Sequence, residues 1–414
     1  MLKNKKTRQN RLTIAGFALL TAVAFGLMLV SNTTMVKSSE ADEFTYLPAI
    51  MHIVPTPTPL PPVFANNIEL PGAYCPNDIG VNEQSGYVYV ANSYSNNVSM
   101  IFQDNFVGNV QIGKLPTDIV SIPNSNRTYI THLTDTQGVE QITIFDQAAL
   151  VDRLPDHFEP HDIIYNPVNE YIYVTDLDST VRVIKGTGPN PEIVDVHLAG
   201  AGWVRSIEVD PLTGLVYAPS WENGIVYVID GTTLVTQFQA GWGTMEISLE
   251  PTSGYFYLAH SNPSTTYPQN ISVFHRDDYT VTPHFTAVRS LDVATDPIHH
   301  LAYATNRKDN SVTVLSGRNV VATLPVGEAP TPVTVDPTTG YAYVGNHDSN
   351  TVTILQNGSV ISTQPAGRQP YAIAVNSQTH DVFVANRTWH IECDDLDRCN
   401  AICDEFVATV TVLR

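Results

Sequence analysis

Carboxylate side chains recur at one fixed position along this 414-residue sequence. Each stands eleven residues before an aromatic residue that belongs to a repeating pattern. The five are Asp78, Asp118, Asp162, Glu246 and Asp292. Carboxylate oxygens that converge on one point could coordinate Ca²⁺, which takes several oxygen ligands. We favour the alternative, in which no cofactor is bound and each carboxylate caps nearby backbone, because a carboxylate in contact with water needs no metal.

A second set of residues combines aromatic rings with polar groups. It consists of Trp203, Trp221, Trp242, Arg205, Glu246, His161, Asp162 and His260. Exposed rings beside a few polar groups are typical of sites that bind sugars or peptides. The sequence therefore predicts a ligand-binding surface here, with rings that pack beneath loops and serve only the fold as the alternative.

Motifs of local catalytic chemistry are absent from the sequence. It contains no Gly-x-Ser-x-Gly, no His-Glu-x-x-His and no glycine-rich phosphate loop. We assign no catalytic residue and expect no enzymatic activity. An extracytoplasmic enzyme of the lactonase or lyase type, which uses dispersed acids and histidines, is the alternative, and His161, Asp162 and Glu246 would then be its candidates.

The chain has four cysteines, Cys75, Cys393, Cys399 and Cys403. An even number of cysteines outside the cytoplasm favours disulfides. We predict one bridge from Cys75 to the cysteine-rich segment 389–403 and a second bridge inside that segment. A zinc site of three cysteines and His390 is disfavoured by their irregular spacing, and the segment's aspartates lack the pattern of a calcium loop.

A unit of about 40 residues repeats eight times from residue 67 onward. It reads as an apolar strand, an Asp-Pro turn, Thr-Gly, Tyr-x-Tyr-Val-x-Asn, a polar loop and Val-x-Val-Ile. The clearest copy begins with Val335-Asp-Pro-Thr-Thr-Gly-Tyr-Ala-Tyr-Val-Gly-Asn346. The central aromatics are Tyr89, Tyr129, Tyr173, Tyr217, Tyr257, Tyr303, Tyr343 and Phe383.

Short alternating apolar and polar runs between Gly, Pro, Asn and Asp turns predict β-strands. Four strands in each unit describe one blade of a β-propeller. The last unit ends after its third strand, and residues 66–71 resemble an isolated fourth strand. We therefore predict an all-β, eight-bladed propeller of four-stranded antiparallel blades in which the N-terminal strand completes the last blade, so that no sheet edge stays open.

These units resemble the YVTN-type β-propeller repeats of secreted and cell-surface proteins. The resemblance rests on V-D-P-x-T-G-x-x-Y-V-x-N followed by N-x-V-x-V-I, and it covers residues 67–414. It is poorest in the second copy, where Ile122-Pro-Asn-Ser-Asn-Arg127 replaces the Asp-Pro turn. The resemblance implies a fold but no particular function, because propellers perform many unrelated functions.

The N-terminal region predicts the location of the protein. Residues 1–11 form a basic head, residues 12–30 are free of charge, and residues 31–65 form a spacer rich in proline and threonine. As a helix, the 19 uncharged residues would span a bilayer. The positive head should stay cytoplasmic. We predict a membrane anchor, with a cleaved signal peptide as the alternative, and an extracytoplasmic propeller at 66–414.

The formal net charge of −20 argues against nucleic acid as a partner, because an acidic surface repels phosphates. The sequence thus predicts a monomeric, membrane-anchored or secreted propeller that acts as a surface binding module. Its partner would be an extracellular protein, peptide or glycan. The alternatives are the enzyme described above and a structural cell-surface protein.

Overall fold

The computed structural model describes residues 60–134, 140–155, 159–188, 190–261, 270–285, 290–387, 389–393, 399–403 and 407–414. The predicted basic head at 1–11 and the predicted anchor at 12–30 lie outside these residues. Within the described part of the chain, no helix is long and apolar enough to cross a membrane. Residues 60–414 form one compact unit.

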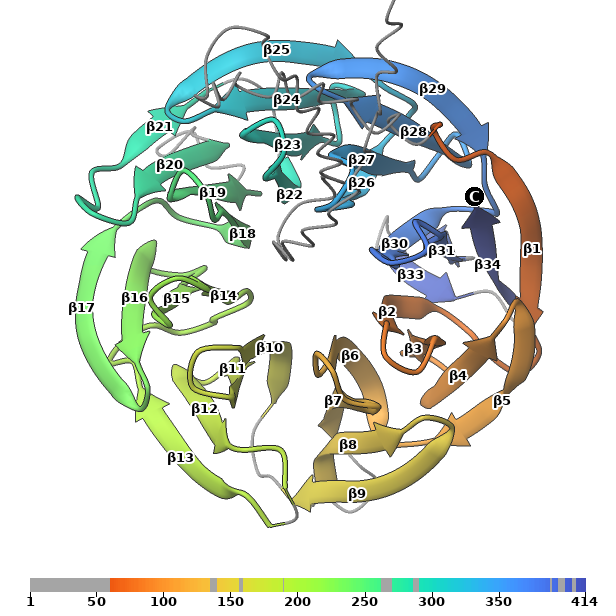
Figure 1. Cartoon of the computed structure of the whole chain (residues 1–414), viewed down its shortest axis with the longest axis horizontal. Helices are drawn as coiled ribbons and strands as arrows, with labels where there is room; N and C mark the ends of the chain where they lie inside the picture. Colours follow the sequence, from red (N-terminus) through yellow and green to blue (C-terminus); the bar gives the residue numbers. More distant parts are fainter. Residues whose placement is uncertain are drawn as a thin grey trace, which may run out of the picture. The chain divides into compact units, whose positions relative to one another are not determined.

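Eight four-stranded antiparallel sheets are arranged as a ring within the described residues (Figure 1). This confirms the predicted eight-bladed propeller. In blades one to seven the strands follow one another in sequence from the axis of the ring outward, whereas the outermost strand of blade eight is β1. Blade one consists of β2 (Pro76–Asn82), β3 (Tyr87–Asn92), β4 (Asn97–Phe102) and β5 (Asn105–Gln111), and blade two of β6 (Lys114–Ser121), β7 (Arg127–Thr134), β8 (Glu140–Asp146) and β9 (Ala149–Pro155). Blade three consists of β10 (Pro160–Asn166), β11 (Tyr171–Asp176), β12 (Thr180–Lys185) and β13 (Glu192–His197), and blade four of β14 (Glu208–Val209), β15 (Val216–Pro219), β16 (Ile225–Asp230) and β17 (Thr233–Gln239).

The second half of the ring follows the same plan. Blade five consists of β18 (Thr244–Glu250), β19 (Tyr255–His260), β20 (Ile271–His275) and β21 (Thr282–His284), and blade six of β22 (Ser290–Asp296), β23 (Leu301–Asn306), β24 (Ser311–Ser316) and β25 (Asn319–Pro325). Blade seven consists of β26 (Pro330–Val335), β27 (Tyr341–Asn346), β28 (Thr351–Gln356) and β29 (Ser359–Pro365), and blade eight of β30 (Pro370–Val375), β31 (Val382–Asn386), β34 (Ala408–Leu413) and β1 (Phe64–Leu70). A hairpin of β32 (Trp389–Cys393) and β33 (Cys399–Cys403) is inserted in blade eight between β31 and β34.

The two ends of the folded region meet in blade eight. Strand β1 pairs antiparallel with β34, from Phe64 opposite Leu413 to Leu70 opposite Ala408. The backbone of Val63 and Arg414 exchanges two further hydrogen bonds of 2.7 and 2.9 Å. The predicted closure by the N-terminal strand is therefore confirmed, with the strand beginning at Phe64. Figure 1 shows β1 at the outer edge of the ring beside β34.

The central aromatic residue of each unit forms the core between blades. The seven tyrosines are at most 1% exposed and Phe383 is 6% exposed. Several hydroxyls cross to the next blade: Tyr89 donates to the carbonyl of Gln147 at 2.8 Å, and Tyr303 accepts the N–H of Gly358 at 3.1 Å. A buried ring that ends in a hydroxyl can thus fill the interior and still satisfy its polar atom.

The backbone conformation of the turn explains why glycine follows threonine in the repeat. Gly340 has a φ of 72°, and a Cβ there would lie 2.7 Å from the ring of His299. Glycine reaches this left-handed conformation without steric cost. The turn also places its Asp-Pro aspartate, Asp336, where it accepts the N–H of Thr338 at 2.9 Å.

Candidate functional site

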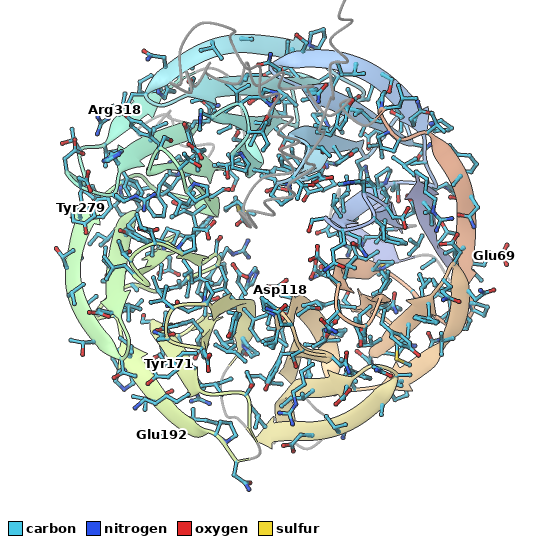
Figure 2. All side chains as sticks on the ribbon, viewed as in Figure 1. Glu69, Asp118, Tyr171, Glu192, Tyr279 and Arg318 are labelled. Carbon is cyan, nitrogen blue, oxygen red and sulfur yellow. The ribbon has the colours of Figure 1, made fainter. Side chains whose placement is uncertain are left out.

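One face of the propeller carries the start of each innermost strand and the loop after each second strand. The register of blade one defines this loop face, because Pro76, Asn92, Asn97 and Gln111 are paired in a row across the sheet. The predicted carboxylates begin the innermost strands just below it. Figure 2 shows Asp118 at the inner edge of the ring, next to its axis.

The axial carboxylates join neighbouring blades. Asp118 accepts the N–H of its own neighbour Ile119 at 2.8 Å and that of Ile163 in blade three at 2.9 Å. Asp162 accepts the N–H of Ile207 in blade four at 2.9 Å. Capping of local backbone is therefore their observed role, and it extends from one blade to the next.

The same bridge recurs farther around the ring. Asp292 accepts the N–H of Val293 at 2.7 Å and that of Val333 in blade seven at 2.8 Å. In blade four Ser206 stands at the carboxylate position, and its hydroxyl donates to Glu246 at 2.7 Å. The carboxylate of this blade, Glu208, lies two residues further on and accepts the N–H of Leu249 at 3.2 Å.

Burial and mutual repulsion favour the protonated forms of these acids. The pKa of Asp78 and that of Asp162 are raised, first by desolvation and then by the charge of Asp118, with which both carboxyls form hydrogen bonds. Desolvation also raises the pKa of Glu246, with Asp292 as the next cause. It raises the pKa of Asp292 to about 6 and that of Glu208 to about 7. Burial and the neighbouring carboxylates therefore shift the titration of these axial acids to higher pH than that of exposed carboxyls.

The calcium hypothesis stays a prediction. Among the described residues, no three His, Cys, Asp or Glu side chains are grouped so that they could hold a metal ion. The carboxylate oxygens of Asp118 and Asp292 already accept backbone N–H groups. These hydrogen bonds account for the acids at these positions without an ion.

The tryptophans of blade four form a contact on the loop face. The ring centroids of Trp203 and Trp221 are 5.8 Å apart. The guanidinium carbon of Arg205 lies 5.4 Å from the centroid of Trp203, which is a cation–π distance. Trp203 is 41% exposed although it is large and apolar. The predicted group is therefore assembled in part, and it presents an open aromatic surface.

Met245 and two members of the predicted group, His161 and Trp242, lie near the Arg205 part of the loop face with different degrees of burial. Met245 is 3.8 Å from the Arg205 guanidinium, measured from Nη1 to Sδ. His161 hydrogen-bonds the backbone of Arg205, and burial followed by the Arg205 charge lowers the pKa of this histidine. Trp242 is half-buried, and the next residue, Gly243, donates its N–H to the carbonyl of Trp221 at 2.9 Å.

His260 does not belong to an open surface. It is 1% exposed, and its ring is hydrogen-bonded to Ser272 at 2.8 Å and to Thr244 at 3.2 Å. Desolvation lowers its pKa to about 3. The side chain occupies the position where other units have Asn, which bonds the same third-strand hydroxyl, as Asn346 bonds Thr353 at 2.9 Å. His260 is therefore a neutral residue of the blade interior, contrary to the predicted ligand role.

A row of basic residues on the loop face was missed from the sequence. Arg307, His347 and Arg387 each follow the loop-starting Asn of blades six, seven and eight. The guanidinium carbon of Arg387 lies 4.4 Å from the ring centroid of Tyr371. The signal was available, because these residues share one position in three consecutive units.

A small cavity lies near Glu208, between the innermost strands of blades three, four and five. Its volume is about 250 Å³, and it is lined by Ile164, Tyr165, Pro167, Glu208, Val209, Pro211, Leu249 and Pro251. Both carboxylate oxygens of Glu208 accept backbone N–H groups, from Val209 and Leu249. Glu208 therefore joins the innermost strands of blades four and five.

Cys75 begins the first blade and is 1% exposed. No described cysteine is a free thiol. Its carbonyl accepts the N–H of Ser93 at 2.9 Å, which fixes the backbone next to the loop of blade one. In the inserted hairpin, Cys393 is paired with Cys399 and Trp389 with Cys403 in the backbone register. The side chains of the hairpin lie outside the described residues, so the predicted connectivity stays a prediction.

Comparison with known proteins extends only to the fold. The chain is similar to a solved structure of the Kuenenia stuttgartiensis hydrazine synthase, with a TM-score of 0.55 and 17% sequence identity over 69% of this chain and 96% of that chain. At this identity the likeness shows a shared propeller-like fold and nothing about activity. No family model matches the sequence. No curated protein matches it either.

Proposed function

We propose that this chain is an extracytoplasmic, membrane-anchored β-propeller that acts as a surface binding module through its loop face. The location is supported by the basic head at 1–11, the uncharged stretch at 12–30 and the spacer at 31–65. It is also supported by the resemblance of the units to YVTN-type repeats of cell-surface proteins. The spacer, with its many prolines, would hold the propeller away from the membrane.

The observation that carries the binding role is the contact of the exposed Trp203 with the half-buried Trp221, with Arg205 beside Trp203. A soluble domain normally buries tryptophan, and an exposed ring that touches a second ring and a guanidinium offers stacking and hydrogen bonding together. The axial acids below have a structural explanation in the inter-blade bridges. The loop face of blade four is therefore the surface we assign to the ligand.

The experiment is a glycan and peptide array probed with the full chain in detergent. We expect Trp203→Ala and Trp221→Ala each to weaken the strongest hit about tenfold or more, as the loss of a central aromatic anchor does. Phe285→Ala is the matched control, because Phe285 is 62% exposed at the end of the outermost strand of blade five. Unchanged binding of every hit by both tryptophan variants would contradict the proposal.

The location has its own test. We expect the full chain to sediment with membranes and to resist extraction by alkaline carbonate, because a spanning helix is held by its apolar surface. A protease added outside intact cells should release the propeller. Recovery of the protein in the cytoplasmic fraction would contradict the proposed location.

A further inference from the structure

Blade four departs from the other blades where its innermost strand begins. In five blades a buried proline is paired with the loop-starting residue of the second strand, whereas in blade four Val204 takes this place and is paired with Ser220. The residue before the proline has a φ of 51–52° in blades one, two, seven and eight. In blade four the left-handed residue is Gly202, with a φ of 63°, and Trp203 follows it. The backbone therefore takes a different path at the point where Trp203 is exposed.

Arg205 stands directly before the position of the axial carboxylates, and we call its place the rim position. The strand register next to this position is the same in all eight blades, so its residues take equivalent places around the axis of the ring. All eight are half-buried. In the other blades the rim position holds Asn77, Thr117, His161, Met245, Leu291, Thr331 and Tyr371. Blade four is therefore the one blade with an arginine or lysine at this position.

The guanidinium of Arg205 lies against apolar and weakly polar groups. Its central carbon is 5.4 Å from the ring centroid of Trp203, and its Nη1 is 3.8 Å from the Sδ of Met245 in blade five. The ring of Trp203 continues into that of Trp221, whose centroid is 5.8 Å away. A positive charge thus borders an apolar surface formed by three side chains.

Arg205 lacks the acidic partner that four other arginines have. Arg182, Arg276, Arg318 and Arg414 each form an ion pair with a carboxylate, and within the described part of the chain no carboxylate lies at ion-pair distance from Arg205. Its Nε is buried and has no hydrogen-bond partner among the described residues. Burial lowers the pKa of Arg205, as expected for a cation without a compensating charge. A guanidinium that finds no acceptor in the fold is unfavourable, and an oxygen atom of a ligand would provide one.

We propose that the loop face binds the free C-terminus of a peptide that ends in an apolar residue, with the terminal carboxylate on Arg205 and the last side chain against Trp203 and Met245. This inference rests on the proposed binding function and names the ligand class. A planar guanidinium matches a carboxylate with two parallel hydrogen bonds. Trp203 and Met245 both contact the guanidinium, so an apolar group attached next to the carboxylate can reach them. A sugar is less suited, because its hydroxyls need hydrogen-bond partners that an indole ring and a thioether do not supply.

The probe is acetyl-Gly-Gly-Phe with a free carboxylate, titrated by calorimetry into the full chain in detergent. The same peptide with a C-terminal amide is the neutral counterpart, and acetyl-Gly-Gly-Gly lacks the apolar side chain. We expect the acid to bind about tenfold more tightly than the amide, in line with the gain from a charge-assisted hydrogen bond. It should also bind about tenfold more tightly than the glycine peptide, because the phenyl ring removes apolar surface from water.

Arg205→Gln should weaken the binding of the acid by a similar factor and leave the binding of the amide unchanged. Arg205→Lys keeps the charge but loses the paired hydrogen bonds, so its affinity for the acid should lie between those of wild type and Arg205→Gln. Arg318→Gln is the matched control, because it removes an arginine paired with Asp278 on the periphery, and it should bind the acid as wild type does (Figure 2).

Stability separates a ligand-binding arginine from a structural one. Arg205→Gln leaves no described carboxylate without its ionic partner, so its midpoint of urea unfolding should equal that of wild type. Circular dichroism of each variant reports whether the sheets are intact.

The outcomes distinguish this inference from the proposed function. Equal affinities of wild type for the acid and the amide overturn the inference, and so does an undiminished preference for the acid in folded Arg205→Gln. The proposed function survives either result if Trp203→Ala weakens the hits of the array, and both fall if the tryptophan variants bind every hit normally.

Two further probes test the ligand class. An amidated peptide in which glutamate replaces phenylalanine, and which binds as tightly as the acid, overturns the assignment to a chain end. A neutral glycan that binds more tightly than the acid, with the same affinity in wild type and Arg205→Gln, overturns the assignment to a peptide.

Discussion

Asp292 of blade six accepts the backbone N–H of Val333 of blade seven at 2.8 Å, across 41 residues of sequence. Its other oxygen accepts the N–H of Val293 at 2.7 Å. One side chain therefore fixes the innermost strands of two blades relative to each other. Asp118 does the same for blades two and three. A ring without a covalent connection between neighbouring inner strands gains rigidity from such bridges, and the loop face depends on this rigidity for its shape.

Asp292→Asn should change how stability depends on pH. The pKa of Asp292 is raised from 3.8 to about 6 in the folded protein. A raised pKa means that the fold is stabilised when this carboxyl is protonated. That contribution to the free energy of unfolding is fully present below pH 3.8 and is lost as the pH rises through about 6. The difference between the unfolded pKa of 3.8 and the folded pKa of about 6 corresponds to at most about 3 kcal/mol of stability. The variant lacks this titration, so wild type should lose stability relative to Asp292→Asn between pH 4 and pH 7 in urea unfolding. Parallel curves over this range would contradict the expectation.

His260→Asn should be tolerated, with a cost of about 1 kcal/mol or less at pH 7, because Asn occupies this position in four other units and would keep one hydrogen bond. The pKa of His260 is lowered to about 3 in the fold. Stability from a histidine held neutral is complete above its unfolded pKa of 6.5 and is lost as the pH falls below that value.

The advantage of wild type over His260→Asn should therefore shrink between pH 7 and pH 4, as followed by thermal unfolding. Glycan or peptide binding should stay unchanged, since the ring is buried. A loss of binding without a loss of stability would show that His260 contacts the ligand after all.

Arg276→Gln should be among the most destabilising single changes in the ring. Arg276 bonds both oxygens of Asp210 at 2.8 and 2.9 Å, and Asp210 is fully buried. Loss of the arginine leaves an uncompensated buried carboxylate between blades four and five, which costs about 3–5 kcal/mol. Urea unfolding of wild type and Arg276→Gln measures this loss of stability. Arg318→Gln breaks an exposed pair and should leave the midpoint unchanged; equal losses in the two variants would refute the argument.

Most of the fold follows from the local pattern of the sequence. The period of the central aromatics locates every blade, and the tyrosines are buried as a repeated core position requires. The closing strand could be predicted because the last unit lacks a fourth strand and residues 66–71 supply one. These features depend on residues close together in sequence, or on a rule that applies to the whole ring.

The site was harder to predict because its contacts join different blades. His260 ends β19, and the hydrogen-bond partner of its ring, Ser272, lies on the next strand, β20. Nothing in the sequence around His260 reveals that partner. Arg387 and Tyr371 meet through the register of blade eight, in which Pro370 is paired with Asn386. Glu208 was missed because the inner strand of blade four is shortened to two residues, with an isolated bridge between Val204 and Ser220.

The proposed disulfides predict a thiol count. Cys75 is buried at the start of blade one, and the inserted hairpin follows β31 in the adjacent blade eight. We expect no cysteine to be alkylated in the unreduced, denatured full chain, and we expect a peptide that joins Cys75 to residues 389–403 by mass spectrometry. Reduction should lower stability by about 2–5 kcal/mol. Alkylation of all four cysteines before reduction would contradict the proposed bridges.

Leu70→Ala should weaken the closure of the ring. Leu70 is fully buried on β1, in a cluster that combines β1, β34 and the inner strands of blades eight and one. Removing its side chain leaves a cavity and should cost about 2–5 kcal/mol. Because β1 covers the edge of β34, its detachment would also expose a strand that can pair with another molecule, so the variant should aggregate during unfolding. Val63→Ala is the control, since Val63 precedes β1 and is 57% exposed. Similar unfolding midpoints for Leu70→Ala and wild type would show that β1 adds little to the stability of the ring, even though it is paired with β34.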